Sequence, residues 1–134
     1  MKAVLHGDGG SRGNPGPAAS GAVLFDEDGE VLAEVHRYLG TQTNNYAEYT
    51  AIIIGLEIAE AHGVTDLIVR LDSELAVKQL KGEYRVKNEA LARLYLQVVN
   101  LSHSFKKIEF QHVRREHNKH ADALVNKALD EAAR

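Results

Sequence analysis

The pattern of apolar and polar positions changes once along the chain, near residue 41. Before that point, apolar residues alternate with polar ones or form short runs, which is typical of strands. We therefore predict strands over residues 1–7, 21–25 and 31–39. Residues 9–17 (GGSRGNPGP) are dense in turn-forming types, and residues 26–29 (DEDG) indicate a hairpin turn. Three strands joined by short turns predict an antiparallel meander.

After residue 41 the spacing of apolar residues becomes helical. It predicts a helix over residues 44–62, with Thr43 or Asn44 as its N-cap and Gly63 as its C-terminal stop. Residues 66–71 (DLIVRL) are apolar and β-branched, as in a buried strand. The remaining predicted elements are a short helix over 73–80 ending near Gly82, a helix over 88–103, a strand over 107–113, and a helix over 118–133 capped by Asn118.

The predicted order of elements is βββ-α-β-α-α-β-α, which belongs to the α/β class. We expect a mixed five-stranded sheet, with three antiparallel strands followed by two α-connected parallel strands, flanked by helices. No internal repeat or Pro/Ser-rich linker interrupts the 134 residues, so we expect residues 1–134 to form a single domain.

Composition limits the compartment and the partners. The chain has no cysteine, which excludes disulfides and thiolate metal sites. It has no apolar signal-peptide segment at its start, and its longest apolar run, residues 51–54, is far too short for a membrane span. We therefore expect a soluble, cytoplasmic protein without membrane contact. No feature calls for an obligate protein partner, and we expect a monomer.

The net charge of −3 by itself disfavours a nucleic-acid partner. If four of the 19 acidic residues hold metal ions, however, 15 remain against 16 Lys and Arg residues. The placement of the charges, and not their sum, therefore decides the question.

Two aspartates are expected at neighbouring strand ends. Asp8 ends the first predicted strand, and Asp72 follows the fourth. If these strands are parallel neighbours, both carboxylates emerge where the sheet reverses its winding. This is the place where α/β sheets bind ligands.

Two further carboxylates lie in the first turns of predicted helices. Glu48 falls in the middle of the apolar stripe of its helix, whereas Glu57 lies on the opposite face. A carboxylate on a packed face is costly unless it is compensated. The alternative interpretation is a Glu that interacts favourably with the helix dipole, and the same alternative holds for Asp122 taken alone.

Taken together, the four carboxylates predict a site for hard cations. Like charges brought into one cleft cannot all stay ionised unaided. Oxygen ligands without cysteine, and seven histidines without an HExxH pattern, favour Mg²⁺ or Mn²⁺ over Zn²⁺.

Four motifs follow one another along the chain: DGGSRGNPGPAA from Asp8, TNNxAE from Thr43, Asp72-Ser73, and Asn118-x-x-x-Asp122. In residue types, order and spacing they resemble type 1 ribonuclease H over nearly the whole chain. The resemblance is to the short form of this family, which lacks the basic protrusion. The resemblance implies the ribonuclease H-like fold. It also implies an endonuclease that hydrolyses the RNA strand of RNA–DNA hybrids and leaves 5′-phosphate and 3′-hydroxyl ends.

The resemblance further implies two Mg²⁺ ions, with Mn²⁺ as a substitute, held about 4 Å apart by the four carboxylates. One ion activates the attacking water, and the other stabilises the leaving 3′ oxygen. Asp8 would bridge the ions. Asp122 would serve the nucleophile side, and Glu48 with Asp72 the leaving-group side.

Selection of RNA requires groups that detect the 2′-hydroxyl. Asn14, in the GNPG turn, matches the family's 2′-hydroxyl contact, although an ordinary tight turn would have the same sequence. Contacts to phosphate or to minor-groove edges are implied for Thr43, Asn44, Asn45 and Ser73. For Thr43 or Asn44 the alternative is a helix cap alone.

The chain departs from the family pattern in three places. Glu74, which only accepts hydrogen bonds, follows Asp72-Ser73 where many relatives have Gln. The link before the last helix is short, so His117 is a candidate for the family's loop histidine, although a surface His beside a cap is more often idle. Arg114 and Arg115 are candidates for phosphate release. A scattered set of basic residues replaces an additional basic helix and predicts weaker, more salt-sensitive binding: Lys78, Lys81, Arg85, Lys87 and Arg93.

Two other functions stay open. A strand-transfer or junction-cleaving enzyme of the wider nuclease superfamily would keep the fold, but the short chain and the GNPG turn disfavour it. A non-catalytic hybrid-binding module is disfavoured by the four carboxylates, because binding phosphate does not call for a negative cleft. A dinucleotide site fails, because Arg12 stands where the third glycine is needed and no P-loop lysine is present.

Overall fold

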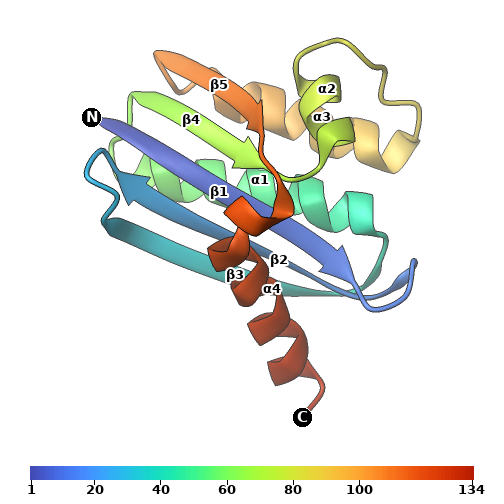
Figure 1. The fold of residues 1–134 in the computed structure, drawn as a ribbon. Helices are drawn as coiled ribbons and strands as arrows, with labels where there is room; N and C mark the ends of the chain where they lie inside the picture. The colour runs from blue at the N-terminus through green and yellow to red at the C-terminus, as the bar shows by residue number, and fades with distance from the viewer.

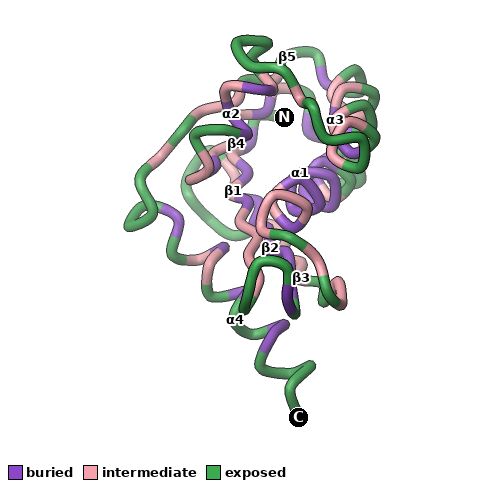
Figure 2. Tube along the Cα trace, turned by 90° about the vertical axis from the view of Figure 1, so that its right-hand side faces the viewer, coloured by how far each residue is buried: buried purple, intermediate pink, exposed green.

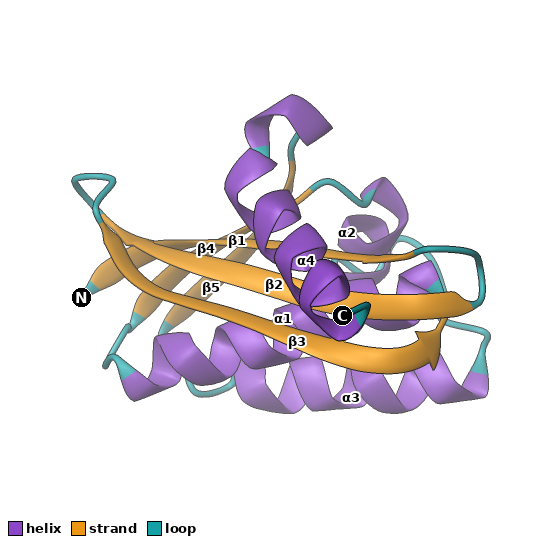
Figure 3. Ribbon diagram, turned by 90° about the horizontal axis from the view of Figure 1, so that it is seen from below, coloured by secondary structure: helices purple, strands orange, loops and turns teal.

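The computed structural model describes all 134 residues as a five-stranded sheet between layers of helices (Figures 1 and 3). The strands are β1 (Lys2–Ser11), β2 (Gly16–Asp26), β3 (Val31–Gln42), β4 (Asp66–Leu71) and β5 (Lys107–His112). The helices are α1 (Asn44–Ala61), α2 (Glu74–Leu80), α3 (Glu89–Ser102) and α4 (Lys119–Ala132), with the 3-10 turn η1 (Arg115–His117) before α4.

The strand order in the sheet is β3-β2-β1-β4-β5. The first three strands pair antiparallel, whereas β4 is parallel to both β1 and β5. This is the mixed sheet expected from the sequence, so the predicted fold class is confirmed. The winding of the sheet reverses at β1, between its antiparallel neighbour β2 and its parallel neighbour β4.

The two faces of the sheet are covered differently, with α1 and α3 on one face and α4 crossing the other (Figure 3). Along β1, Ala3 and Leu5 are buried towards the α1 face, and the alternate residues Val4 and His6 are only partly buried. Buried residues gather along α1 and the strands facing it, whereas the C-terminal part of α4 is largely exposed (Figure 2). None of the helices has both the length and the apolar composition that crossing a membrane requires.

The first hairpin is longer than the sequence pattern predicts. β1 continues to Ser11 and β2 begins at Gly16, so the turn is confined to the four residues between them. Asp8 therefore lies inside β1, and its prediction as the end of that strand is wrong. The reason is that pairing with β4 stops at Gly7 and Leu71, whereas pairing with β2 continues through the glycine-rich stretch to Ser11.

The helix ends follow local chemistry, with one exception. Thr43 caps α1, because its hydroxyl accepts a hydrogen bond from the Tyr46 N–H at 3.1 Å. Gly63 follows the end of α1 with a φ of +74°, which favours glycine. Asn118 is the N-cap residue of α4, as predicted, but its side chain makes no capping hydrogen bond.

Candidate active site

The N-terminus of α1 is pressed against β1 at Gly9. A Cβ atom at this position would overlap the backbone of Ala47 and Glu48, so only glycine fits. From β2, the buried hydroxyl of Ser20 donates to the Ala47 carbonyl at 2.6 Å. These contacts bring Glu48, just after the first turn of α1, beside Asp8 in β1.

Asp72 reaches the same place from β4. Leu71, the last residue of β4, is the register partner of Gly7 in β1, so Asp72 emerges next to Asp8. The Leu71 carbonyl accepts a hydrogen bond from the Val113 N–H at 2.8 Å, which holds β4 to the chain just beyond β5 at this level. The two aspartates therefore come together at the carboxyl end of β4.

Asp122 arrives from the opposite face of the sheet. Helix α4 crosses β2 at Gly21, where a Cβ would come within 2.8 Å of the Leu124 Cβ and 2.9 Å of the Ala121 carbonyl oxygen. Gly21 is also the register partner of Asp8. This close approach carries the first turn of α4, with Asp122, to the pocket that Asp8 lines.

All four carboxylates line a single pocket with a volume of about 450 Å³. A larger hollow of about 840 Å³ lies at the other end of the sheet, where β1, β4 and β5 begin. In α/β sheets ligands bind outside the carboxyl ends of the strands, where the winding reverses, so the smaller pocket is the candidate site. Its other polar lining residues are Ser11, Arg12, Asn44, Ser73, Arg115 and Asn126.

The pocket carries more negative charge than it can hold ionised. Burial, the charge of Asp72, and the hydrogen-bonding contact and charge of Asp122 raise the pKa of Asp8 to about 8. Burial and the charge of Asp72 also raise the pKa of Glu48, and a hydrogen bond with Ser73 opposes them. A cation in this pocket would oppose both the burial and the repulsion that raise the pKa of Asp8.

Existing positive charge near the carboxylates is sparse. The Arg115 Nη2 lies 3.9 Å from the Asp122 Oδ1, but its side chain is 81% exposed, so water weakens this pair. No group of three or more His, Asp or Glu side chains is arranged to hold a metal ion. An open set of carboxylates suits Mg²⁺, which keeps several water ligands and takes only one or two carboxylates of its own. The donor set therefore fits a hard divalent cation.

The tip of the first hairpin is fastened to the start of α1. The Asn44 side-chain oxygen accepts from the Ser11 N–H at 2.8 Å and from its hydroxyl at 3.0 Å. The Asn44 N–H donates to the Asn14 side-chain oxygen at 3.1 Å. Asn14, Thr43 and Asn45 line an adjoining hollow of about 370 Å³ instead of the carboxylate pocket. Asn44 and Ser73 line the carboxylate pocket itself.

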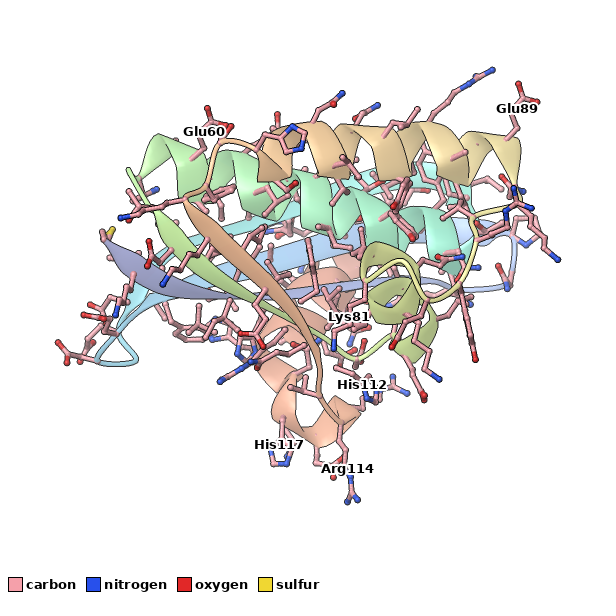
Figure 4. All side chains as sticks on the ribbon, turned by 90° about the horizontal axis from the view of Figure 1, so that it is seen from above. Glu60, Lys81, Glu89, His112, Arg114 and His117 are labelled. Atoms are coloured by element: carbon pink, nitrogen blue, oxygen red, sulfur yellow. The ribbon has the colours of Figure 1, made fainter.

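Two further predicted residues line neither the carboxylate pocket nor the adjoining hollow. His117 and Arg114 project outward from the link between β5 and α4, and both are exposed (Figure 4). Arg115, between them, does line the pocket. Glu74 does not line the pocket either, and it forms an ion pair with Lys78 at 2.9 Å.

Three polar residues of the pocket are missing from the sequence-based set. Asn126 lies one turn after Asp122, with its amide nitrogen 3.5 Å from the Asp122 Oδ2, and the i, i+4 spacing was the signal that identifies it. Ser11 is the last residue of β1, and the prediction assigned it to a turn. Arg12 pairs with Asp130 at 2.6 Å, and no local pattern connects residues 118 positions apart.

The family model described as "Reverse transcriptase-like" matches residues 6–128. The crystal structure of RNase H1 from the halophilic archaeon Halobacterium salinarum superimposes with a TM-score of 0.95 at 43% identity, covering 98% of this chain and 99% of that one. The chain belongs to the type 1 ribonuclease H family. A second ribonuclease H, LC11-RNase H1 solved in complex with an RNA/DNA hybrid, gives a TM-score of 0.94 at 40% identity, covering 98% and 99% of the two chains.

Some relatives of this ribonuclease H chain are longer. The bifunctional protein Rv2228c of Mycobacterium tuberculosis is 46% identical over 134 residues, which cover 99% of this chain but 37% of that protein. The Halobacterium salinarum ribonuclease HI matches at 46% identity over 93% of this chain and 63% of its own length. The chain thus spans between about a third and two thirds of the length of these curated relatives.

Proposed function

We propose that this protein is an endonuclease that hydrolyses the RNA strand of RNA–DNA hybrids and leaves 5′-phosphate and 3′-hydroxyl ends. The observation that carries the proposal is the single pocket shared by Asp8, Glu48, Asp72 and Asp122, in which the pKa of Asp8 rises to about 8. Membership of the ribonuclease H family supports the same reaction. So does a relative at 40% identity that was solved with a bound RNA/DNA hybrid. Residues 1–134 are proposed to act as one domain, because one sheet joins all five strands.

The proposed cofactor is a pair of Mg²⁺ ions, with Mn²⁺ as a substitute, held by the four carboxylates. Such ions supply an activated water and stabilise the charge that develops on the leaving oxygen. Asp8 has the Asp72 and Asp122 carboxylates as neighbours, so it is suited to contribute to both cations. Asp122 approaches from the α4 face and is assigned to the nucleophile side. Glu48 and Asp72 are assigned to the leaving-group side, where the Ser73 hydroxyl helps to keep Glu48 ionised.

The proposed RNA contacts lie on the hairpin tip and at the start of α1. The side-chain oxygen of Asn14 already accepts a hydrogen bond from Asn44, which leaves its amide N–H groups to donate to a 2′-hydroxyl oxygen. Likewise, the Asn44 oxygen is occupied by Ser11, which leaves its amide donors for the substrate. Thr43, Asn45 and Ser73 complete the proposed set of contacts to phosphate and minor groove.

The basic residues of α2, the following loop and α3 are proposed to bind the DNA strand through its phosphates: Lys78, Lys81, Arg85, Lys87 and Arg93. Lys81 is exposed at the end of α2 (Figure 4). Removing one phosphate contact should lower the slope of log affinity against log salt by about 1. A Lys81→Ala protein whose salt slope equals that of the wild type would remove Lys81 from this surface.

The β5–α4 link is assigned a smaller role. Arg115 lines the pocket, and with Arg114 it is proposed to assist release of the phosphate product. His117 is proposed to assist water activation. If the turnover of the His117→Ala protein stays within about twofold of wild type, a margin below the usual contribution of acid–base catalysis, the assignment of His117 is withdrawn.

A matched set of variants tests the proposed activity. A labelled RNA–DNA hybrid is incubated with Mg²⁺ and the wild type, Asp72→Asn, or Glu57→Gln, which removes an exposed carboxylate on the far side of α1. We expect the wild type and Glu57→Gln to cleave the RNA strand and Asp72→Asn to lose this cleavage. We expect a DNA duplex to remain uncut. Hybrid that is bound but never cut would favour the non-catalytic module. Cutting of junctions or DNA in preference to the hybrid would favour another nuclease-superfamily reaction.

We also propose that the protein is a cytoplasmic monomer. The absence of cysteine is compatible with a reducing compartment. Light scattering coupled to size exclusion measures the molar mass directly, and a value near twice 14.7 kDa would contradict the monomer.

A further inference from the structure

Asn118 is a fully buried polar residue whose side chain is not used in the way its position suggests. It stands immediately before α4 and is 0% exposed. Instead of capping the helix, its amide nitrogen donates to the Gly7 carbonyl oxygen at 2.9 Å, across 111 positions of sequence. Gly7 precedes Asp8 and is the residue at which the pairing of β1 with β4 ends. The amide therefore holds β1 just before its carboxylate.

The backbone of the same residue holds the second carboxylate. The Asn118 carbonyl accepts the hydrogen bond of the Asp122 N–H at 3.1 Å, which closes the first turn of α4. Asn118 thus contacts the neighbour of Asp8 with its side chain and Asp122 with its main chain. It is a direct connection between the strand that carries Asp8 and the helix that carries Asp122.

Stability alone does not account for an asparagine here. The side-chain oxygen of Asn118 is buried without a hydrogen-bond partner, the one side-chain atom of the protein in this condition. A contact with the Asn118 side chain raises the pKa of the His6 imidazole, against the larger lowering effect of burial, but its geometry falls short of a hydrogen bond to this oxygen. A buried, unpaired acceptor is unfavourable, and an apolar side chain of similar size would avoid it. What an apolar side chain lacks is the N–H group that reaches Gly7.

We propose that Asn118 is a positioning residue that fixes the separation of Asp8 and Asp122, and so the geometry of the cation site, by tying the start of α4 to β1. The proposal rests on the proposed nuclease function and deepens it. In other proteins, replacing a group that orients a metal ligand without touching the metal typically lowers metal affinity or activity by roughly 10- to 100-fold. An effect of that size is expected from removing the Asn118 amide.

The test replaces Asn118 by leucine, which keeps the number and branching of the side-chain heavy atoms and removes both the N–H donor and the unpaired oxygen. Binding of Mg²⁺, and of Mn²⁺ as a second probe, is measured by calorimetry without substrate. Turnover and KM on a hybrid follow at saturating metal. The free energy of unfolding by urea is measured with a chelator present, so that it reports the stability of the metal-free protein. The expected result is metal affinity at least about 10-fold weaker and a lower kcat, with KM for the hybrid and the metal-free stability retained.

A control separates positioning from simple docking of α4. Glu131→Gln removes the contact of α4 with His36 at 3.4 Å, far from the start of the helix, and should leave metal affinity and kcat unchanged. If Asn118→Leu does not fold, Asn118→Ser removes the same amide with a loss of volume and is measured in its place.

The outcomes distinguish the two proposals. A variant that loses stability but keeps the wild-type metal affinity and kcat shows a structural role and overturns the positioning proposal. Equal loss of metal affinity in Asn118→Leu and Glu131→Gln also overturns it, because any loosening of α4 would then suffice. If the wild type neither binds the metals nor cleaves the hybrid, the proposed function itself fails.

Discussion

On one face of the sheet α1 packs into an apolar cluster of 18 buried residues, whereas on the other face α4 packs on a cluster of four. Glu48 is carried by the first of these helices and Asp122 by the second. The position of Glu48 is set by close packing, since Gly9 and Gly55 allow α1 to touch β1 at two points along its length. Dense apolar packing of this kind depends little on salt or pH.

The position of Asp122 depends on the close approach of α4 to Gly21 and also on polar contacts. Beyond its small apolar cluster, α4 is joined to the sheet through Arg12 with Asp130, His36 with Glu131, His120 with Glu34, and Asn118 with Gly7. Exposed ion pairs of this kind are individually weak and are screened by salt. One side of the carboxylate pocket is thus held by extensive burial, whereas the other combines a small apolar cluster with a few specific polar groups.

The largest expected effect comes from the carboxylates themselves, whichever face they lie on. Glu48→Gln and Asp122→Asn should each lower kcat on a hybrid by at least about 100-fold. The reason is that replacing residues that only orient a metal ligand already lowers metal affinity or activity by about 10- to 100-fold. Single-turnover cleavage at saturating Mg²⁺ measures this. Near-normal turnover in either variant would remove that carboxylate from the site.

The packing difference should appear as unequal losses of stability. Ile52→Ala, in the large cluster, should lower the free energy of unfolding by about 2–5 kcal/mol, and Leu129→Ala, in the small cluster, should fall at or below the lower end of that range. Ile52 is 0% exposed and Leu129 is 5% exposed. Urea unfolding of both variants checks the order. A larger loss for Leu129→Ala would invalidate the comparison of the two faces.

The charge of the pocket should make the metal-free protein less stable as pH rises. From about pH 4 to about pH 8 the unfolded chain releases the proton that folded Asp8 retains, so the free energy of unfolding falls across this window. Asp8→Asn should remove most of this slope. Mg²⁺ should restore the stability of the wild type near pH 8, because a bound cation favours the ionised carboxylates. Identical pH profiles for wild type and Asp8→Asn would contradict the raised pKa.

The smallest expected effect concerns an ion pair on α4. Arg12→Ala removes the pair with Asp130, whose side chains are 47% and 63% exposed, and should change the free energy of unfolding by less than about 1 kcal/mol. The difference from wild type should shrink further in high salt. A loss of several kcal/mol would mean that the α4 face depends on this pair far more than its exposure suggests.

Local patterns were sufficient for most elements and insufficient for their ends. The apolar run before Asp72 and the helical spacing around Glu48 each identified an element correctly, because a strand or helix imposes its period on nearby residues. The glycine-rich stretch after Asp8 was misassigned to a turn, since glycines that permit close packing in a strand look the same in sequence as glycines that permit a turn. Asn118 was assigned a capping role for a similar reason, because position along the chain favours a cap and only the fold brings Gly7 within reach.

The sequence by itself determined the order of strands and helices, the family, and which four carboxylates are candidates for the site. Each of these depends on residue type and short-range spacing, which the chain carries in any conformation. Only the tertiary structure decided that α4 crosses the sheet at Gly21, that Asn126 and Arg12 join the pocket, and how far the pKa of Asp8 rises. These depend on distances between residues remote in sequence, and burial and charge–charge repulsion exist only once folding has brought them together.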